Sequence, residues 1–188
     1  MKEEIKEVNV TFVTGSIYKK EYLESLLGLK IKNHKVDLDE IQDLDLNKVV
    51  EHKVRQAYEI LKTPVLVEDV GLEFTEMGKL PGAFMKFFLT ELSMQQICDL
   101  IKGEDRSATA RCVFGYFDGK DLKLFESSMK GTILRSPDSS DGGYGWDKIF
   151  MPDGYRVARS KLSKEDDHKT YLQVKPIEKV RQFLLNLK

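Results

Sequence analysis

An apolar run that ends in two adjacent acids constrains this chain more than any other feature. Residues 65–67, Val-Leu-Val, are typical of a short buried strand, and Glu68 and Asp69 follow directly. Open α/β sheets bind ligands at the carboxyl ends of their strands, so this position favours a binding site. The two acids alone would also fit an ordinary acidic turn at the surface.

The segment that follows makes a binding site the stronger interpretation. Residues 78–82, GKLPG, predict a shaped turn, and Lys86 lies among three phenylalanines. Carboxylates, a turn and a cation therefore fall together within residues 63–88. This combination is typical of a site that handles a metal-bound anion.

Length and composition limit the class of protein. The 188 residues suffice for one large domain or two tightly merged lobes, and 41% hydrophobic with 32% charged residues is typical of a soluble globular protein. A net charge of −1 gives no indication of nucleic acid or of an anionic membrane as a partner. The first residues lack an apolar signal core, so we expect a cytoplasmic protein. Cys98 and Cys112 are expected to be core thiols in a reducing compartment.

Strand and helix signals alternate along the chain and predict an α/β fold. The expected strands are residues 8–13, 30–36, 108–117 and 122–133, of which the last two form a hairpin around Asp118-Gly119. The expected helices are residues 17–27, 46–61, 94–101 and 176–187. Residues 136–155 form the longest irregular stretch and contain the only tryptophan, Trp146, and long ordered loops of this kind often carry function.

The start of the first predicted helix has an unusual charge. Ser16 is a suitable N-cap after Thr14 and Gly15, but Lys19 and Lys20 stand in the first turn, where the helix dipole disfavours cations. A phosphate bound by the N–H groups of the helix start and by Lys19 would resolve the conflict. Two solvated lysines explain the local sequence equally well.

The other candidate residues are acids and lysines. Glu40 lies in an acidic loop, and Lys53 falls on the apolar stripe of the helix at residues 46–61, where it could extend to the surface or point into a pocket. Carboxylates suit Mg²⁺, and lysines suit phosphate oxygens. The residues thus favour a Mg²⁺-dependent enzyme that acts on a phosphorylated small molecule, without a P-loop motif.

A set of motifs in a fixed order resembles the inosine triphosphate pyrophosphatase family. They are TGSIYK at residues 14–19, LDEIQ at 38–42, VEDVGL at 67–72, LPGAFMKFF at 80–88 and YGWDKIFMPDGY at 144–155. The resemblance implies hydrolysis of non-canonical purine nucleoside triphosphates (ITP, dITP and XTP) to the monophosphate and pyrophosphate, with attack at the α-phosphorus. It implies Mg²⁺, with Mn²⁺ as a possible substitute, and a homodimer. It also implies a single domain of residues 1–188, in which a long mixed α/β sheet is flanked by helices and two lobes surround a substrate cleft.

The resemblance also implies a role for each candidate residue. Glu40 and Asp69 would bind the metal, and Asp69 or Glu68 would activate the water, with Lys19 as a further catalytic group. The triphosphate would be held by Thr14, Gly15, Ser16, Lys19, Lys53, Lys86 and, beside Asp69, Val70. The base pocket would consist of Tyr144, Gly145, Trp146, Asp147, Lys164, His168 and Lys169.

The chain departs from the family pattern at three places. Ser16 replaces an asparagine and Tyr144 a phenylalanine, which we expect to tune the site. Asp167-His168-Lys169 stands where the family has Ser-His-Arg, and a lysine offers a single point donor in place of a planar fork. We therefore expect weaker or altered discrimination between bases. The alternatives are a related pyrophosphatase with a different or relaxed base specificity, or a nucleotide-binding protein without turnover.

Overall fold

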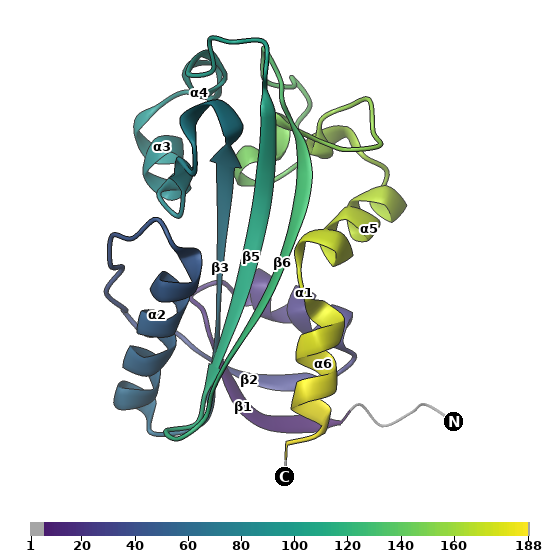
Figure 1. Cartoon of the computed structure of the whole chain (residues 1–188). Coiled ribbons are helices and arrows are strands. Elements are labelled where there is room, and N and C mark those ends of the chain that lie inside the picture. Colours follow the sequence, from purple (N-terminus) through teal and green to yellow (C-terminus); the bar gives the residue numbers. More distant parts are fainter. Residues whose placement is uncertain (1–5, 188) are drawn as a thin grey trace. The chain divides into compact units, whose positions relative to one another are not determined.

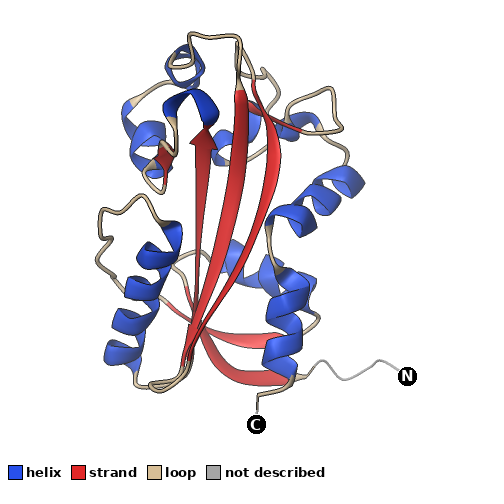
Figure 2. Cartoon of the chain, in the orientation of Figure 1, coloured by secondary structure: helices blue, strands red, loops and turns tan. Residues whose placement is uncertain are grey.

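The computed structural model describes residues 6–187, which divide into two compact units. Unit 1 holds residues 6–69, 113–126 and 176–187, and unit 2 holds residues 70–112 and 127–175. The chain contains both helices and strands (Figure 2). The described strands form a seven-stranded sheet in the order β2-β1-β3-β5-β6-β7, with β4 paired to β3. Since β1 pairs in parallel with β2 and β3 while β6 and β7 are antiparallel, the expected mixed α/β sheet is confirmed.

The elements are labelled in Figure 1. The strands are β1 (Glu7–Val13), β2 (Lys30–His34), β3 (Val65–Phe74), β4 (Pro81–Gly82), β5 (Ser107–Phe117), β6 (Leu122–Ile133) and β7 (Phe150–Pro152). The helices are α1 (Ile17–Leu27), α2 (Leu46–Leu61), α3 (Met85–Glu91), α4 (Met94–Asp99), α5 (Lys164–Val174) and α6 (Ile177–Leu185). Short 3₁₀ helices occur at η1 (Thr75–Met77), η2 (Gly145–Lys148) and η3 (Arg159–Lys161).

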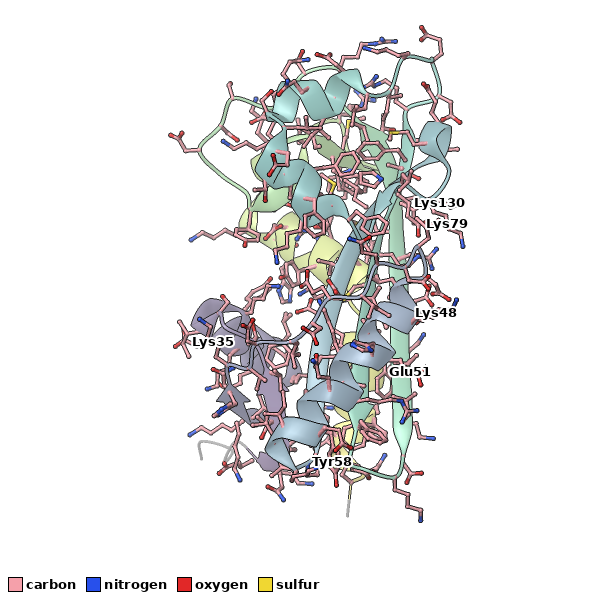
Figure 3. All side chains as sticks on the ribbon, turned by 90° about the vertical axis from the view of Figure 1, so that its left-hand side faces the viewer. Lys35, Lys48, Glu51, Tyr58, Lys79 and Lys130 are labelled. Atoms are coloured by element: carbon pink, nitrogen blue, oxygen red, sulfur yellow. The ribbon has the colours of Figure 1, made fainter. Side chains whose placement is uncertain are left out.

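In unit 1, helices cover both faces of the strands. Figure 1 shows α2 on one side of β3 and β5, and α6 on the other. Asp45 caps α2, and the helix buries a stripe formed by Leu46, Val49, Val50, Val54 and Ala57. The helix approaches β5 closely, because a Cβ at Gly115 would lie 2.6 Å from Val50 Cγ1. Lys48, Glu51 and Tyr58 mark the length of α2 in Figure 3.

In unit 2, one buried cation holds several chain ends together. Arg106 is 8% exposed, and its guanidinium donates hydrogen bonds of 2.8 Å to the carbonyl oxygens of Cys98, Ile101, Ile133 and Leu134. These bonds satisfy the end of α4 and the end of β6 with a single side chain. The fixed fork of arginine matches this arrangement of carbonyl groups.

The structure differs from the sequence prediction at three places. The strand expected to end at the acids continues to Phe74, so Glu68 and Asp69 lie inside β3. Residues 85–91 form the helix α3, whose start has no side-chain cap and hence no sequence signal. Residues 164–174 form the helix α5 behind the cap Ser163, a helix that was not predicted. Among residues 6–187, no helix is long and apolar enough to cross a membrane.

Candidate active site

One ammonium group joins two acids that are far apart in the sequence. Lys53 Nζ donates to Asp69 Oδ2 at 2.6 Å and to Glu40 Oε1 at 2.9 Å. The lysine side chain is 12% exposed. Burial disfavours its charged form, but the two carboxylates outweigh burial and raise the pKa of Lys53 above its ordinary value. The sequence allowed Lys53 either to extend to the surface or to point into a pocket, and the structure shows that it points inward to the acids.

The strand β3 distinguishes between its two acids. Successive side chains of a strand point to opposite faces, so Glu68 and Asp69 project from opposite sides of β3. Asp69 is the one that reaches Lys53 on α2. Of the two adjacent carboxylates, the geometry therefore selects Asp69 as the partner of Glu40 and Lys53.

The acidic loop before α2 is anchored by a reciprocal pair of hydrogen bonds. Gln56 Oε1 accepts from the backbone N–H of Asp39, and Gln56 Nε2 donates to Asp39 Oδ2, both at 2.8 Å. Gln56 stands three positions after Lys53, which places both on one face of α2. Anchoring at Asp39 therefore brings the next residue, Glu40, to the lysine.

The start of α1 belongs to the same unit. Ser16 Oγ accepts from the Lys19 N–H at 3.3 Å, and the Ser16 N–H donates to Thr14 Oγ1 at 3.2 Å, so Ser16 is the predicted N-cap. The strands β1 and β3 are parallel, with Thr11 opposite Val65 and Phe12 opposite Leu66. The turn of Thr14 and Gly15 follows directly after the end of β1 at Val13. Lys19 is exposed on the first turn of the helix.

The capacity for a metal rests on the acid pair. Among residues 6–187, no group of three or more His, Cys, Asp or Glu side chains is gathered so that it could hold a metal ion. Mg²⁺, however, commonly binds through one or two carboxylates together with substrate phosphates and water. Two carboxylates that already converge on one cation, Lys53 Nζ, fit that requirement.

The remaining candidates lie in unit 2. Lys86 is exposed on α3, and Val70 follows Asp69 in β3. Tyr144 is 85% exposed, and its N–H donates to Asp147 Oδ2 at 2.9 Å. Gly145 takes a φ of 58°, which turns the chain into the helix η2 with Trp146 and Asp147. The YGWD motif therefore forms one ordered turn that presents an aromatic ring.

The Asp147 carboxyl is mostly buried. Burial raises its pKa, while the Arg159 guanidinium and the Tyr144 N–H oppose that rise. Arg159 donates to it at 3.3 Å. Sequence reasoning missed Arg159, because this contact spans twelve positions of irregular backbone and follows no helix or strand period.

The helix α5 carries the last three candidates, Lys164, His168 and Lys169, all exposed. Lys169 Nζ lies 2.8 Å from Glu165 Oε1 and 3.6 Å from Asp166 Oδ1, both one turn earlier. The hydrogen bond to Glu165 is the main cause that raises the pKa of Lys169. The structure thus describes Lys169 as a cation paired within its own helix.

Comparisons with known proteins agree with each other. The model of the Ham1 family matches residues 10–183. The chain is 38% identical to the inosine triphosphate pyrophosphatase of Scheffersomyces stipitis, over 94% of this chain and 98% of that protein. It is 36% identical to the enzyme of the same name from Yarrowia lipolytica, over 94% and 96%. Its fold matches a HAM1 protein of Coxiella burnetii with a TM-score of 0.83, at 19% identity over 97% of this chain and 100% of that chain.

Proposed function

The chain belongs to the Ham1 family, and from that premise we propose that it is a metal-dependent nucleoside triphosphate pyrophosphatase. It hydrolyses non-canonical purine nucleotides (ITP, dITP and XTP) to the monophosphate and pyrophosphate, and so removes them from the nucleotide pool. The relatives named inosine triphosphate pyrophosphatase support this proposal. The observation that carries it is the convergence of Glu40 and Asp69 on Lys53.

Glu40 and Asp69 are the residues that would hold Mg²⁺, or Mn²⁺ in its place. A bound divalent cation supplies a Lewis acid that withdraws charge from the phosphate oxygens. With the carboxylates on the metal, the Lys53 ammonium would be available to phosphate oxygens, which also accept charge-assisted hydrogen bonds.

Hydrolysis proceeds by attack of water on the α-phosphorus. Asp69 or Glu68 accepts the proton of the attacking water, and the bond between the α-phosphorus and the bridging oxygen breaks to release pyrophosphate. Lys19, Lys53 and Lys86 offset the negative charge on the phosphate oxygens. Thr14, Gly15 and Ser16 receive the phosphates at the start of α1, where the helix dipole favours anions.

The base is bound by the residues of unit 2 that the sequence indicates. The Tyr144 ring stacks on the purine, and Gly145, Trp146 and Asp147 shape the turn beneath it. Val70 lines the substrate site beside Asp69. The α5 residues Lys164, His168 and Lys169 are further candidates to contact the base edge.

The wider assignments follow from the same proposal. We treat the two units as one functional domain, because β3 passes from one into the other without a break. The protein acts as a homodimer on nucleotides of the cytoplasm, and needs neither nucleic acid nor a membrane for its reaction.

A pyrophosphate-release assay with the purified chain and Mg²⁺ tests the function. ITP, XTP, dITP, GTP and ATP are compared, with pyrophosphate and orthophosphate measured separately. We expect pyrophosphate from ITP, XTP and dITP at higher kcat/KM than from GTP or ATP. Release from no nucleotide would leave a binding protein without turnover, and equal kcat/KM for ITP and GTP would indicate a pyrophosphatase of relaxed specificity. Hydrolysis in ¹⁸O-labelled water, with the label found in the monophosphate, identifies the α-phosphorus as the point of attack.

A further inference from the structure

A buried arginine connects the YGWD turn to the helix α5. Arg159 side-chain atoms are 9% exposed. Its Nη1 donates to Asp147 Oδ1 at 3.3 Å, its Nη2 to Asp167 Oδ1 at 3.0 Å and its Nε to Thr170 Oγ1 at 3.2 Å. The guanidinium carbon also lies 4.9 Å from the centre of the Tyr171 ring. Each nitrogen of the guanidinium thus has an acceptor, and two of the three acceptors belong to α5.

The contact of Arg159 with α5 includes a buried threonine that is itself hydrogen-bonded. Thr170 is fully buried, and its hydroxyl donates to the Asp167 carbonyl oxygen at 2.8 Å. Thr170 and Asp167, two of the three groups that hold the guanidinium, are thus joined to each other within α5. Arg159 in turn holds the Asp147 carboxylate in place, so any effect of Arg159 on the base is exerted through Asp147.

Two glycines before the YGWD turn allow Asp147 to lie close to Arg159. A Cβ at Gly143, whose φ is 83°, would lie 2.8 Å from Asp147 Cβ and 2.8 Å from Ser160 Cβ. A Cβ at Gly142 would lie 2.6 Å from the Ser160 carbonyl oxygen. Only glycines allow this approach, which sets Asp147 against η3, where Arg159 lies.

The charges around Asp147 determine its protonation state. Burial is the largest influence and leaves the pKa of Asp147 above its ordinary value, whereas Arg159 on η3 and the Tyr144 N–H lower it and Asp167 on α5 raises it. The other cation of η3, Lys161, binds Asp138 at 2.7 Å, and that bond holds the pKa of Asp138 at about 2. The strand β7, which also packs on η2, brings no titratable side chain. Arg159 is thus the cation in contact with Asp147 among these groups.

The protonation state decides which base Asp147 can bind. An ionised carboxylate only accepts hydrogen bonds, and the bonds from Tyr144 and Arg159 account for two of its roughly four lone-pair sites. Hypoxanthine, xanthine and guanine carry a hydrogen on N1 beside the 6-oxo group, whereas N1 of adenine is itself an acceptor. A neutral carboxyl could donate to adenine and would lose this distinction.

We propose that Arg159 is a specificity-determining positioning residue, which keeps Asp147 an ionised and oriented acceptor for the N1–H of 6-oxopurines. The proposal rests on the proposed function and on the base lying at the YGWD turn. It makes the carboxylate of Asp147 the group that rejects ATP, with Arg159 as its support. Removal of Arg159 leaves the mostly buried Asp147 carboxyl without its cation. The population of its neutral form then increases, and adenine can bind.

The test compares Arg159→Met and Arg159→Lys with the wild type on ITP and ATP. We expect Arg159→Met to raise KM for ITP more than it lowers kcat, and to reduce the ITP/ATP ratio of kcat/KM roughly tenfold or more, the range for one charged hydrogen-bonding partner. The loss should grow as the pH falls, because the pKa of Asp147 rises when Arg159 is absent. Arg159→Lys should restore part of the ratio at mildly alkaline pH.

Lys161→Met is the matched control, since Lys161 is the neighbouring cation of η3 and binds Asp138. Its ITP/ATP ratio should remain that of the wild type. An unchanged ratio and pH profile in a folded Arg159→Met protein would overturn the proposal.

A double-mutant cycle with Asp147→Asn separates positioning from a general effect on folding. In the Asp147→Asn background, Arg159→Met should no longer change the ratio, because the carboxylate through which it acts is gone. If Arg159→Met lowers the ratio by the same factor in both backgrounds, Arg159 does not act through Asp147. Equilibrium binding of inosine and adenosine monophosphates gives the same comparison without turnover, so a failure of the proposed function remains distinguishable from a failure of this inference.

Discussion

Lys53 Nζ lies 2.6 Å from Asp69 Oδ2, closer than the 2.9 Å that separates it from Glu40 Oε1. The same ammonium reaches Glu40, so one cation offsets two carboxylates. Any divalent ion that takes the two carboxylates must therefore compete with Lys53.

Replacing Lys53 should separate metal binding from turnover. In Lys53→Met the carboxylates lose their internal cation, so we expect Mn²⁺ to bind more tightly in the absence of nucleotide, by calorimetry. kcat/KM for ITP should nevertheless fall roughly a hundredfold, because a charge that stabilises the transition state is lost. Lys48→Met is the control, since Lys48 lies on the same helix and pairs with Asp43 at 3.5 Å (Figure 3). Weaker Mn²⁺ binding in Lys53→Met would show that Lys53 and the metal do not compete for the two carboxylates.

The two acids of β3 should contribute unequally. Asp69→Asn keeps the volume of the side chain but removes its charge, and we expect kcat for ITP to fall by about a thousandfold or more with little change in Tm. Glu68→Gln, on the opposite face of the strand, should cost less. Pyrophosphate release and thermal unfolding are measured for both proteins. A near-normal rate in Asp69→Asn would show that the geometry selects the wrong acid.

Substitution of Gly143 should weaken base binding more than substitution of another glycine with a positive φ. Gly143→Ala places a Cβ within 2.8 Å of Asp147 and Ser160, so we expect KM for ITP to rise. Gly154 has a similar φ of 87°, but its Cβ would meet no atom within 4 Å. Gly154→Ala therefore costs only the backbone strain, roughly 1–2 kcal/mol, and should leave KM unchanged. Equal KM values for the two variants would show that the close approach of Gly143 to Asp147 does not matter for base binding.

Both cysteines should be unreactive in the folded protein. Cys98 and Cys112 are buried free thiols, as expected from the sequence, and burial raises the pKa of Cys98 to about 11. The nucleophile is the thiolate, which is scarce at mildly alkaline pH when the pKa is so high. Titration with a thiol-specific disulfide reagent should therefore be slow until denaturant is added, and then both thiols should react. Rapid reaction of the native protein would contradict this burial.

Elements with strong local signals could be predicted from the sequence. The bounds of α1 and α2 agree with the expectation, because each has a polar cap and an abrupt end. The helix α3 was missed, since Phe84 at its start provides no side-chain cap. The strand β3 was expected to end too early, because its acids interrupt the apolar run while the backbone continues to pair with β4 at Leu72 and Glu73.

The candidate site was predictable in its residue types and less so in its contacts. The pairing of Lys53 with Glu40 depends on Gln56, whose amide anchors the loop to α2. No periodicity encodes that tertiary contact. The support of Asp147 by Arg159 depends likewise on glycines that fit one loop against another. Such contacts arise from packing, which local sequence patterns do not record.

The contacts of Arg106 imply that some positions of unit 2 tolerate substitution much better than others. Its four acceptors are main-chain carbonyl oxygens of residues 98, 101, 133 and 134, which every amino acid provides. Those positions are therefore free to change side chain so far as this network is concerned. The requirement falls on position 106 alone, where a lysine or methionine would leave buried carbonyl groups without a donor. The presence of one residue, Arg106, is thus enough to keep four backbone carbonyl groups hydrogen-bonded.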